Sequence, residues 1–199
     1  MKLNELRDKI YQNAVDKGFW DGTEEGFSLP EKLVLMHSEV SAALEADRIG
    51  RHFNKENLLA NELENKDKYI FLGAFSQAVK DTLEDELADI VIRCLDLCGK
   101  LEINVDTDVE RKIDIFTREP AFLKAALGDT IPSSLCFVHM LISDAYKAYF
   151  CNDISSHLTG VISAVIMIAR YSGSNIEKHI EMKMRYNSII GEAYDSEEE

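Results

Sequence analysis

Apolar residues recur every three or four positions along almost all of the 199-residue chain, which is the spacing of one face of an α-helix. Only three prolines and ten glycines interrupt this pattern, which disfavours the many turns of a β-sandwich or β-barrel. Ser28 before Pro30, Thr107 with Asp108, and Ser134 stand where helix caps are expected. The sequence therefore predicts a single all-α domain, with helices at about 2–17, 30–50, 74–100, 106–118, 132–151, 153–172 and 175–189.

The two halves of the chain show a faint internal repeat. LVLMHSEVSAALEA aligns with LCFVHMLISDAYKA, which places His37 over His139. LADIVIRCLDL aligns with LTGVISAVIMI, and DVERKI aligns with HIEMKM, so that Lys112 falls on Lys183. Two helical hairpins packed about a pseudo-twofold axis, an internally duplicated pseudo-dimer, would produce this repeat. The alternative is that any two amphipathic helices resemble each other.

The repeat divides the chain into two halves of unequal length. The first half, residues 1–118, carries about 30 extra residues near the polar segment 50–80. Pro120–Pro132 is the expected connection to a second half at 132–189. Residues 190–199 form an acidic tail. Its last residues, DSEEE, form an acidic run that we expect to be disordered because like charges repel.

The charge and hydropathy of the chain limit the kinds of molecule and compartment that are expected for it. The net charge of −14 works against non-specific binding to nucleic acid or to an anionic membrane. The amino terminus, MKLNELRDKIYQNAVDKGFW, has no apolar core of the kind that a secretory signal needs. The most apolar stretch, GVISAVIMIARYSG, is shorter than the roughly 20 residues of a membrane span. We expect a buried helix there and a cytoplasmic protein.

The four cysteines do not indicate a metal or disulfide framework. Cys94, Cys98, Cys136 and Cys151 match neither a zinc-site spacing nor a dense disulfide pattern. The sequence predicts four reduced thiols in the core.

Charged residues form a narrow stripe on the helix expected around residues 82–98. Glu86, Asp89, Arg93 and Asp96 share this stripe, and apolar residues cover nearly all the rest. Because such a helix is usually buried, these charges need partners within the protein. The alternative is a solvent-exposed stripe in which Asp89 pairs with Arg93 one turn later.

Glu39 lies in the middle of an apolar face of small residues on the earlier helix, EKLVLMHSEVSAALEADR. A lone buried carboxylate is costly unless it meets a cation or stays protonated. If this face meets the stripe, then Glu39, Glu86 and Asp89 form a cluster of three carboxylates. An all-oxygen cluster suits a hard divalent cation such as Mg²⁺ or Mn²⁺.

HSEVSAALEADR followed by EDELADIVIRCLDL resembles the MazG-like, all-α nucleoside triphosphate pyrophosphohydrolases, which include the dimeric dUTPase and dCTPase relatives. The signature of that family is E-x-x-E on one helix and E-x-x-D on a later one. The resemblance extends to NAVDKGFW, with Trp20, and to KMRYN, with Lys183, Tyr186 and Asn187. It implies a MazG-like helical bundle.

The resemblance also implies an activity and a set of metal ligands. In this family four motif carboxylates hold Mg²⁺, and a nucleoside triphosphate is cut between its α and β phosphates to give a monophosphate and pyrophosphate. Glu39 matches the first glutamate, and Glu86 and Asp89 match E-x-x-D. The second glutamate falls on Ala42 instead, and the chain ends in an acidic rather than a basic tail.

The same resemblance implies residues that bind the substrate. Trp20 is expected to stack on the nucleobase, and Lys183 and Asn187 are expected to hold phosphate or sugar. Arg93 is also expected to bind the substrate. In the second half, the positions that align with Glu39, Glu86 and Asp89 hold Leu141, His157 and Gly160.

Two other interpretations stay open at this point. A degenerate member of the family, which binds nucleotides or is purely structural, would have lost catalysis with the glutamate at Ala42. A helical interaction module would have the Glu39 face covered by a partner chain. A duplicated chain could be a self-sufficient pseudo-dimer or could form a homodimer through its apolar helices.

Overall fold

The structure, a computed structural model, describes residues 2–20, 28–54, 56 and 58–195. Within these ranges it is all-helical and contains no strand, so the all-α prediction is confirmed. The elements are α1 (Leu3–Asp16), α2 (Leu29–Arg48), the short 3₁₀ helix η1 (Leu58–Glu64), α3 (Lys68–Ala78), α4 (Leu83–Lys100), α5 (Asp106–Arg118), α6 (Pro120–Leu127), α7 (Ile131–Tyr149), α8 (Ile154–Tyr171) and α9 (Ile176–Asp195).

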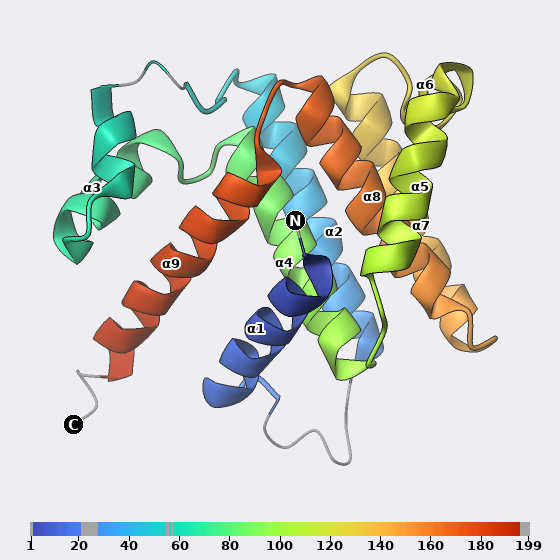
Figure 1. The fold of residues 1–199 in the computed structure, drawn as a ribbon, viewed down its shortest axis with the longest axis horizontal. Helices are drawn as coiled ribbons and strands as arrows, with labels where there is room; N and C mark the ends of the chain where they lie inside the picture. Colours follow the sequence, from blue (N-terminus) through green and yellow to red (C-terminus); the bar gives the residue numbers. More distant parts are fainter. Residues whose placement is uncertain (1, 21–27, 55, 57, 196–199) are drawn as a thin grey trace.

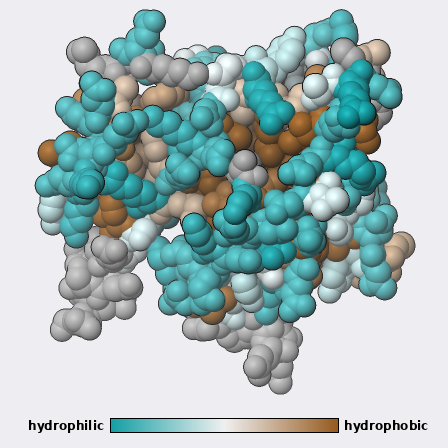
Figure 2. All heavy atoms as spheres, in the orientation of Figure 1, coloured by the Kyte–Doolittle hydropathy of each residue, from teal (hydrophilic) through white to brown (hydrophobic). Residues whose placement is uncertain are grey.

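Helices α2, α4, α7 and α8 form the centre of the bundle. α2 packs on α4 and α7 packs on α8, and the contacts of α2 with α7 and of α4 with α8 join the two pairs. α1 and α9 cover α4, α5 covers α8, and η1 and α3 stand at one end beside α9 (Figure 1). Polar residues cover most of the face drawn in Figure 2, and apolar residues show mainly in its middle.

α8 is a strongly apolar helix that is buried in the bundle. It is the one helix in the described ranges that is long and apolar enough to cross a membrane, but 67% of its apolar window is buried inside the bundle. The side chains from Leu158 to Ala169 are all buried. The predicted buried helix in this stretch is therefore confirmed.

The single helix predicted at 74–100 is wrong, because the chain turns between α3 and α4. Asp81 adopts a left-handed backbone conformation with φ 59°. Thr82 then caps α4, its side chain accepting a hydrogen bond from the backbone N–H of Asp85. Apolar periodicity continues across this turn, so the pattern alone does not reveal it.

Two further sequence expectations need correction at helix ends. Ser28 caps α2 as predicted, but Thr130 rather than Ser134 caps α7. Neither Thr107 nor Asp108 caps α5, which begins at Asp106 with no side-chain cap. The carboxylate of Asp106 instead accepts hydrogen bonds from the first backbone N–H groups of α1, so the two helix starts are tied together.

The prediction of four core thiols holds for two of the four. All are free cysteines, and Cys94 and Cys98 are buried in α4. Cys136 and Cys151 are exposed, because Cys136 lies on the outer face of α7 and Cys151 lies in the turn after it.

Residues that align between the two halves occupy matching places. α4 and α8 are both 18 residues long, and each is followed by a residue with positive φ, Glu102 or Gly173. His37 of α2 stacks on its aligned residue His139 of α7, with ring centroids 5.0 Å apart. The aligned positions buried in both helices are Leu33, Met36, Val40, Ala43 and Ala46 of α2 and Leu135, Val138, Ile142, Ala145 and Ala148 of α7.

The last helix of each half packs against the other half. α5 follows α4 but covers α8, and α9 follows α8 but covers α4. The aligned lysines on these two helices therefore also contact the opposite halves. Lys112 Nζ lies 3.1 Å from Thr159 Oγ1 of α8, and Lys183 Nζ reaches α4.

We predict that the close approach of α1 to α4 depends on Gly99. A Cβ at Gly99 would collide with the side chain of Tyr11 on α1, so Gly99→Ala should lower the free energy of unfolding by about 1–3 kcal/mol. Gly73→Ala, in the middle of α3 with nothing within 4 Å, is the matched control. It should be neutral or stabilise by up to about 1 kcal/mol. Urea denaturation measures both, and equal effects of the two variants would contradict the prediction.

Candidate metal centre and the adjoining pocket

Three carboxylates from two helices converge where α2 packs on α4. Glu39, Glu86 and Asp89 each place an oxygen within 4.8 Å of the other two. Glu86 and Asp89 are one turn apart on α4 and therefore share a face of that helix. The structure thus brings together the three residues that helical spacing had placed on facing surfaces. Carboxylate oxygens are the ligands that hard divalent cations prefer.

Glu39 is held by an arginine from the opposite helix. Its side chain is 14% exposed, and its Oε1 accepts a hydrogen bond of 2.6 Å from Nε of Arg93. Arg93 lies one turn beyond Asp89, yet its ion pair runs to α2 rather than to Asp89. The described residues therefore do not form the alternative arrangement, a solvent-exposed stripe in which Asp89 pairs with Arg93.

Lys183 brings a second cation to the cluster from α9. Its Nζ lies 2.7 Å from Oδ2 of Asp89 and 2.9 Å from Oδ2 of Asp85. Burial lowers the pKa of Lys183, but attraction by Asp89 and Asp85 outweighs it and leaves the pKa raised. Lys183 therefore stays charged and joins α9 to α4.

Asp85 belongs to this cluster, and the sequence analysis did not select it. Its side chain is fully buried, with Oδ2 accepting from Lys183 and from the backbone N–H of Asp81. Its Oδ1 is buried and has no hydrogen-bond partner among the described residues. Asp81, Asp85 and Glu86 form a second group of carboxylates within 4.8 Å. The signal that could have found Asp85 is its place one turn before Asp89 on an almost wholly apolar helix.

Crowding of these acids changes their protonation. Burial, followed by repulsion from Asp89 and Asp85, raises the pKa of Glu86 to about 8. Burial also raises the pKa of Asp89 to about 6, although Lys183 opposes the rise. Near neutral pH, Glu86 is therefore largely protonated unless a further positive charge enters the cluster.

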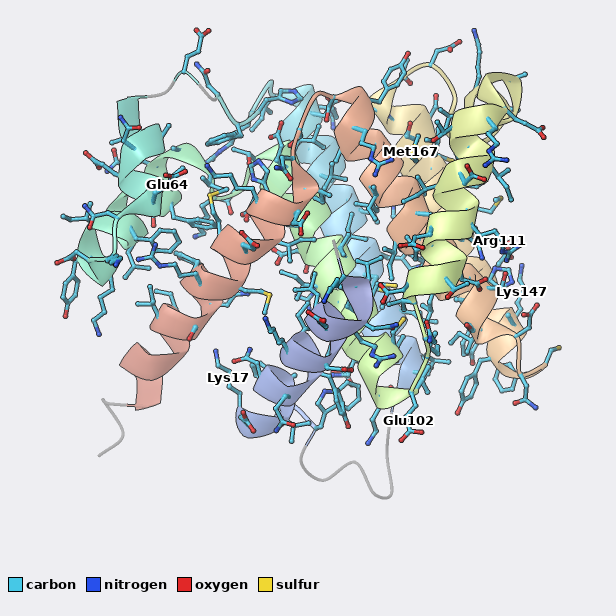
Figure 3. The ribbon with its side chains drawn as sticks, viewed as in Figure 1. Lys17, Glu64, Glu102, Arg111, Lys147 and Met167 are labelled. Atoms are coloured by element: carbon cyan, nitrogen blue, oxygen red, sulfur yellow. The ribbon has the colours of Figure 1, made fainter. Side chains whose placement is uncertain are left out.

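A pocket of about 430 Å³ opens beside the cluster, between α1, α4 and α9. Asp89 connects the pocket to the carboxylates, and Lys17, Arg93 and Asn187 give it basic and amide groups. Lys17 extends from the end of α1 (Figure 3), and its Nζ donates a 2.9 Å hydrogen bond to the backbone carbonyl of Asn187. The apolar part of the wall includes Ile10, Ala14, Ile92 and Ile190.

Trp20 does not present the free face expected of a base-stacking residue. It is 6% exposed, and its Nε1 donates a 3.0 Å hydrogen bond to Oδ1 of Asp96. The ammonium of Lys32 lies 4.1 Å from the ring centroid. Asp96 itself lines the pocket, as does Phe19, which is 65% exposed. Trp20 thus supports the pocket through Asp96, and Phe19 is the accessible aromatic ring.

The corresponding place in the second half contains no such group of carboxylates. Gly160 aligns with Asp89 and Leu141 aligns with Glu39. A Cβ on Gly160 would lie 3.5 Å from the Leu141 side chain and 4.0 Å from Lys112. The positions that align with Glu39, Asp89 and Lys183 are therefore neighbours as well, but Leu141 and Gly160 stand there in place of the two acids.

Comparison with known proteins leaves the site to be interpreted on its own geometry. The chain matches no protein-family model, and searches of curated proteins and of solved structures find no match. The arguments about function therefore rest on the carboxylate cluster, its two cations and the pocket beside them.

We predict that removing the crowded carboxylate at Glu86 stabilises the metal-free protein at high pH. Because the pKa of Glu86 is about 8 in the folded state and 4.5 is its ordinary value, the folded state holds the extra proton, and stability falls as pH rises between these values. In chelator, Glu86→Gln should exceed the wild type in unfolding free energy at pH 8.5 by on the order of 1–3 kcal/mol, and by less at pH 5.

Urea denaturation at the two pH values measures this difference. Glu45→Gln removes an exposed carboxylate on α2 and serves as the control, which should shift stability little at either pH. A Glu86→Gln effect that is the same at pH 5 and pH 8.5 would show that the crowding is absent in solution.

Proposed function

We propose that this chain is a metal-dependent nucleoside triphosphate pyrophosphohydrolase of the MazG-like kind, acting between the α and β phosphates. The observation that carries the proposal is the convergence of Glu39, Glu86 and Asp89 at the edge of a pocket that also holds Lys17 and Arg93. Carboxylates beside basic groups suit a polyphosphate bound through a divalent cation.

The residues at the cluster fit Mg²⁺ or Mn²⁺. Glu39, Glu86 and Asp89 would hold the ion, and all their donor atoms are oxygen. Glu86 with its raised pKa and Asp85 with its unpartnered oxygen are groups that an added positive charge would stabilise. Asp85 adds a further carboxylate beside Glu86, in a chain that has Ala42 where the family signature has its second glutamate. The bound ion would polarise the phosphate and neutralise charge that develops there.

The remaining steps use side chains of the chain itself. A carboxylate of the cluster, Glu39 or Glu86, accepts a proton from water as the water oxygen bonds to phosphorus. The bridging P–O bond breaks, and pyrophosphate leaves with its electron pair. Arg93 and Lys183 would contact phosphate oxygens, and Asn187, which lies at the pocket wall, would contact sugar or phosphate. The fold supports these roles because α1, α4 and α9 all contribute to one pocket.

We also propose that the chain is an internally duplicated pseudo-dimer with one working site. The shared burial pattern of α2 and α7 and the stacked pair His37 and His139 support this, since residues at a twofold axis contact their own counterparts. The second half would complete the bundle and supply Lys183 and Asn187 to the first. The buried α8 and the net charge of −14 favour a cytoplasmic protein that binds neither membrane nor nucleic acid.

A degenerate, nucleotide-binding or structural relative is the second candidate, and a specific observation favours it. Arg93 pairs with Glu39, and Lys183 pairs with Asp89 and Asp85. Two internal cations therefore already compensate three of the acids. Ala42 stands where the family signature has its second glutamate, so the cluster has one metal ligand fewer.

The first test is pyrophosphate release from a panel of ribo- and deoxyribonucleoside triphosphates with Mg²⁺ or Mn²⁺. We expect metal-dependent release by the wild type, and a loss of at least about 100-fold in Glu86→Gln, because a ligand and candidate base is removed. The far-ultraviolet circular dichroism of the variant should match the wild type. Release that persists in folded Glu86→Gln, or no release by the wild type with any substrate, would overturn the proposal.

The variant Ala42→Glu separates the active enzyme from the degenerate relative. Residue 42 is one turn after Glu39 on α2, where the family signature has its second glutamate. If the existing carboxylates suffice, kcat/KM should change by less than about fivefold, which is on the order of 1 kcal/mol. A large gain in activity or in Mg²⁺ affinity, measured by calorimetry, would instead identify the natural site as degenerate.

A further inference from the structure

α9 is held on two sides, and only one of them faces the carboxylate cluster. Figure 1 shows α9 running between α3 and α4. Lys183 faces α4 and pairs with its acids. Met182, Tyr186 and Ile189 pack instead into a separate hydrophobic cluster with η1 and α3, which includes Leu63, Phe71, Phe75 and Val79. The part of α9 that carries Lys183 is therefore fixed from the outside as well as the inside.

The ring of Phe75 is the closest link between this outer cluster and Lys183. Phe75 is fully buried, and its ring stacks on Tyr186 with centroids 4.5 Å apart and an interplanar angle of 21°. The ammonium of Lys183 lies 5.9 Å from the centroid of the same ring, within the range of a cation–π contact. One aromatic ring thus contacts both the lysine and the residue three positions after it.

Neighbouring contacts hold the same stretch of α9 against the segment before α4. The guanidinium carbon of Arg185 lies 3.9 Å from the centroid of the Phe71 ring. Nη2 of Arg185 also donates a 2.6 Å hydrogen bond to the backbone carbonyl of Asn65. Glu64, labelled on η1 in Figure 3, accepts a 2.9 Å hydrogen bond from Lys178. These contacts extend along α9 over about two turns.

Among the described residues, no inserted segment supports α5, the helix that corresponds to α9; α5 contacts the short helix α6 that follows it. Residues 49–82 separate α2 from α4, whereas only residues 150–153 separate α7 from α8. Lys112, which aligns with Lys183, is held by Thr159 and lies 3.7 Å from Asp108 on its own helix. The extra segment is thus present in the half that has the acids and absent from the half that lacks them.

We propose that η1 and α3 form a clamp that positions Lys183 for the carboxylate cluster, with Phe75 and Tyr186 as its positioning residues. A lysine side chain has four rotatable bonds, so its ammonium is well placed only if the helix that carries it is fixed. The clamp supplies this constraint from the side away from α4. The inference rests on the proposed function, in which Lys183 contacts phosphate.

A double-mutant cycle of Tyr186 with Lys183 tests the clamp. We expect Tyr186→Ala to lower kcat/KM for the preferred nucleoside triphosphate by about 10- to 100-fold, because Lys183 is misplaced. In the Lys183→Met background the same change should cost less than about threefold, because the residue that it positions is already gone. Tyr186→Phe keeps the stacked ring and should restore wild-type kcat/KM.

Phe116→Ala is the matched control for loss of stability. Phe116 is a buried aromatic residue on α5, the corresponding helix of the other half. Its removal should lower unfolding stability by an amount similar to that of Tyr186→Ala and leave kcat/KM near the wild-type value. If Phe116→Ala lowers kcat/KM as much as Tyr186→Ala does, or if Tyr186→Ala costs the same with and without Lys183, the clamp is overturned.

The four proteins of the double-mutant cycle are the wild type, Tyr186→Ala, Lys183→Met and the double variant. Their unfolding in urea also tests the clamp, without nucleotide. We expect the stability losses of Tyr186→Ala and Lys183→Met to be non-additive, because the two side chains share Phe75. Additive losses would overturn the clamp. If the wild type releases no pyrophosphate but the unfolding cycle is non-additive, the proposed function fails and the clamp stands as a structural link between α9 and α4.

Discussion

The feature on which the rest of the structure depends is the burial of several acidic side chains at one end of α4. Glu84, Asp85 and Glu86 lie in the first turn and are all buried, and Asp89 follows one turn later. Like charges this close repel strongly when they leave water. The positive end of the α4 dipole favours acids in its first turn, but it does not compensate all of them. The protein therefore has to bring cations, donors or protons to this point.

The positive and donor groups come from α4 itself and from other elements. Arg93 of α4 pairs with Glu39 of α2, the backbone N–H of Phe53 in the loop after α2 donates to Glu84, and α9 places Lys183 between Asp85 and Asp89. Because α9 begins after α8, its lysine reaches α4 only if the second half folds against the first. The packing of α9 of the second half on α4 of the first is therefore linked to the need for a positive charge beside Asp85 and Asp89. If α4 had apolar residues at these positions, no cation from another helix would be needed there.

The sequence was sufficient for elements whose identity depends on local spacing. The helices around α1, α2, α5, α7 and α8 follow from apolar periodicity, and the approach of Glu39 to Glu86 and Asp89 follows from helical wheels on facing surfaces. The break between α3 and α4 depends on the left-handed backbone of Asp81, which leaves the apolar spacing unchanged. The partners of Asp85 and Trp20 come from α9 and from Asp96, far away in the sequence. Single-helix patterns carry no information about such contacts.

Whether the cluster acts on a substrate depends on a competition between cations. Lys183 and Arg93 already occupy oxygens that a divalent ion would use, so binding of the ion must displace or share these contacts. A single ammonium brings one charge, whereas Mg²⁺ brings two at a shorter distance to oxygen, and that charge would favour the ionised form of Glu86, whose pKa is raised to about 8 by burial and by its acidic neighbours. A displaced Lys183 would still lie next to the ion, where the phosphates of a substrate are expected. The pairing of Lys183 with Asp85 and Asp89 is therefore compatible with the proposed catalysis, because it holds the ammonium beside the oxygens that would bind the ion.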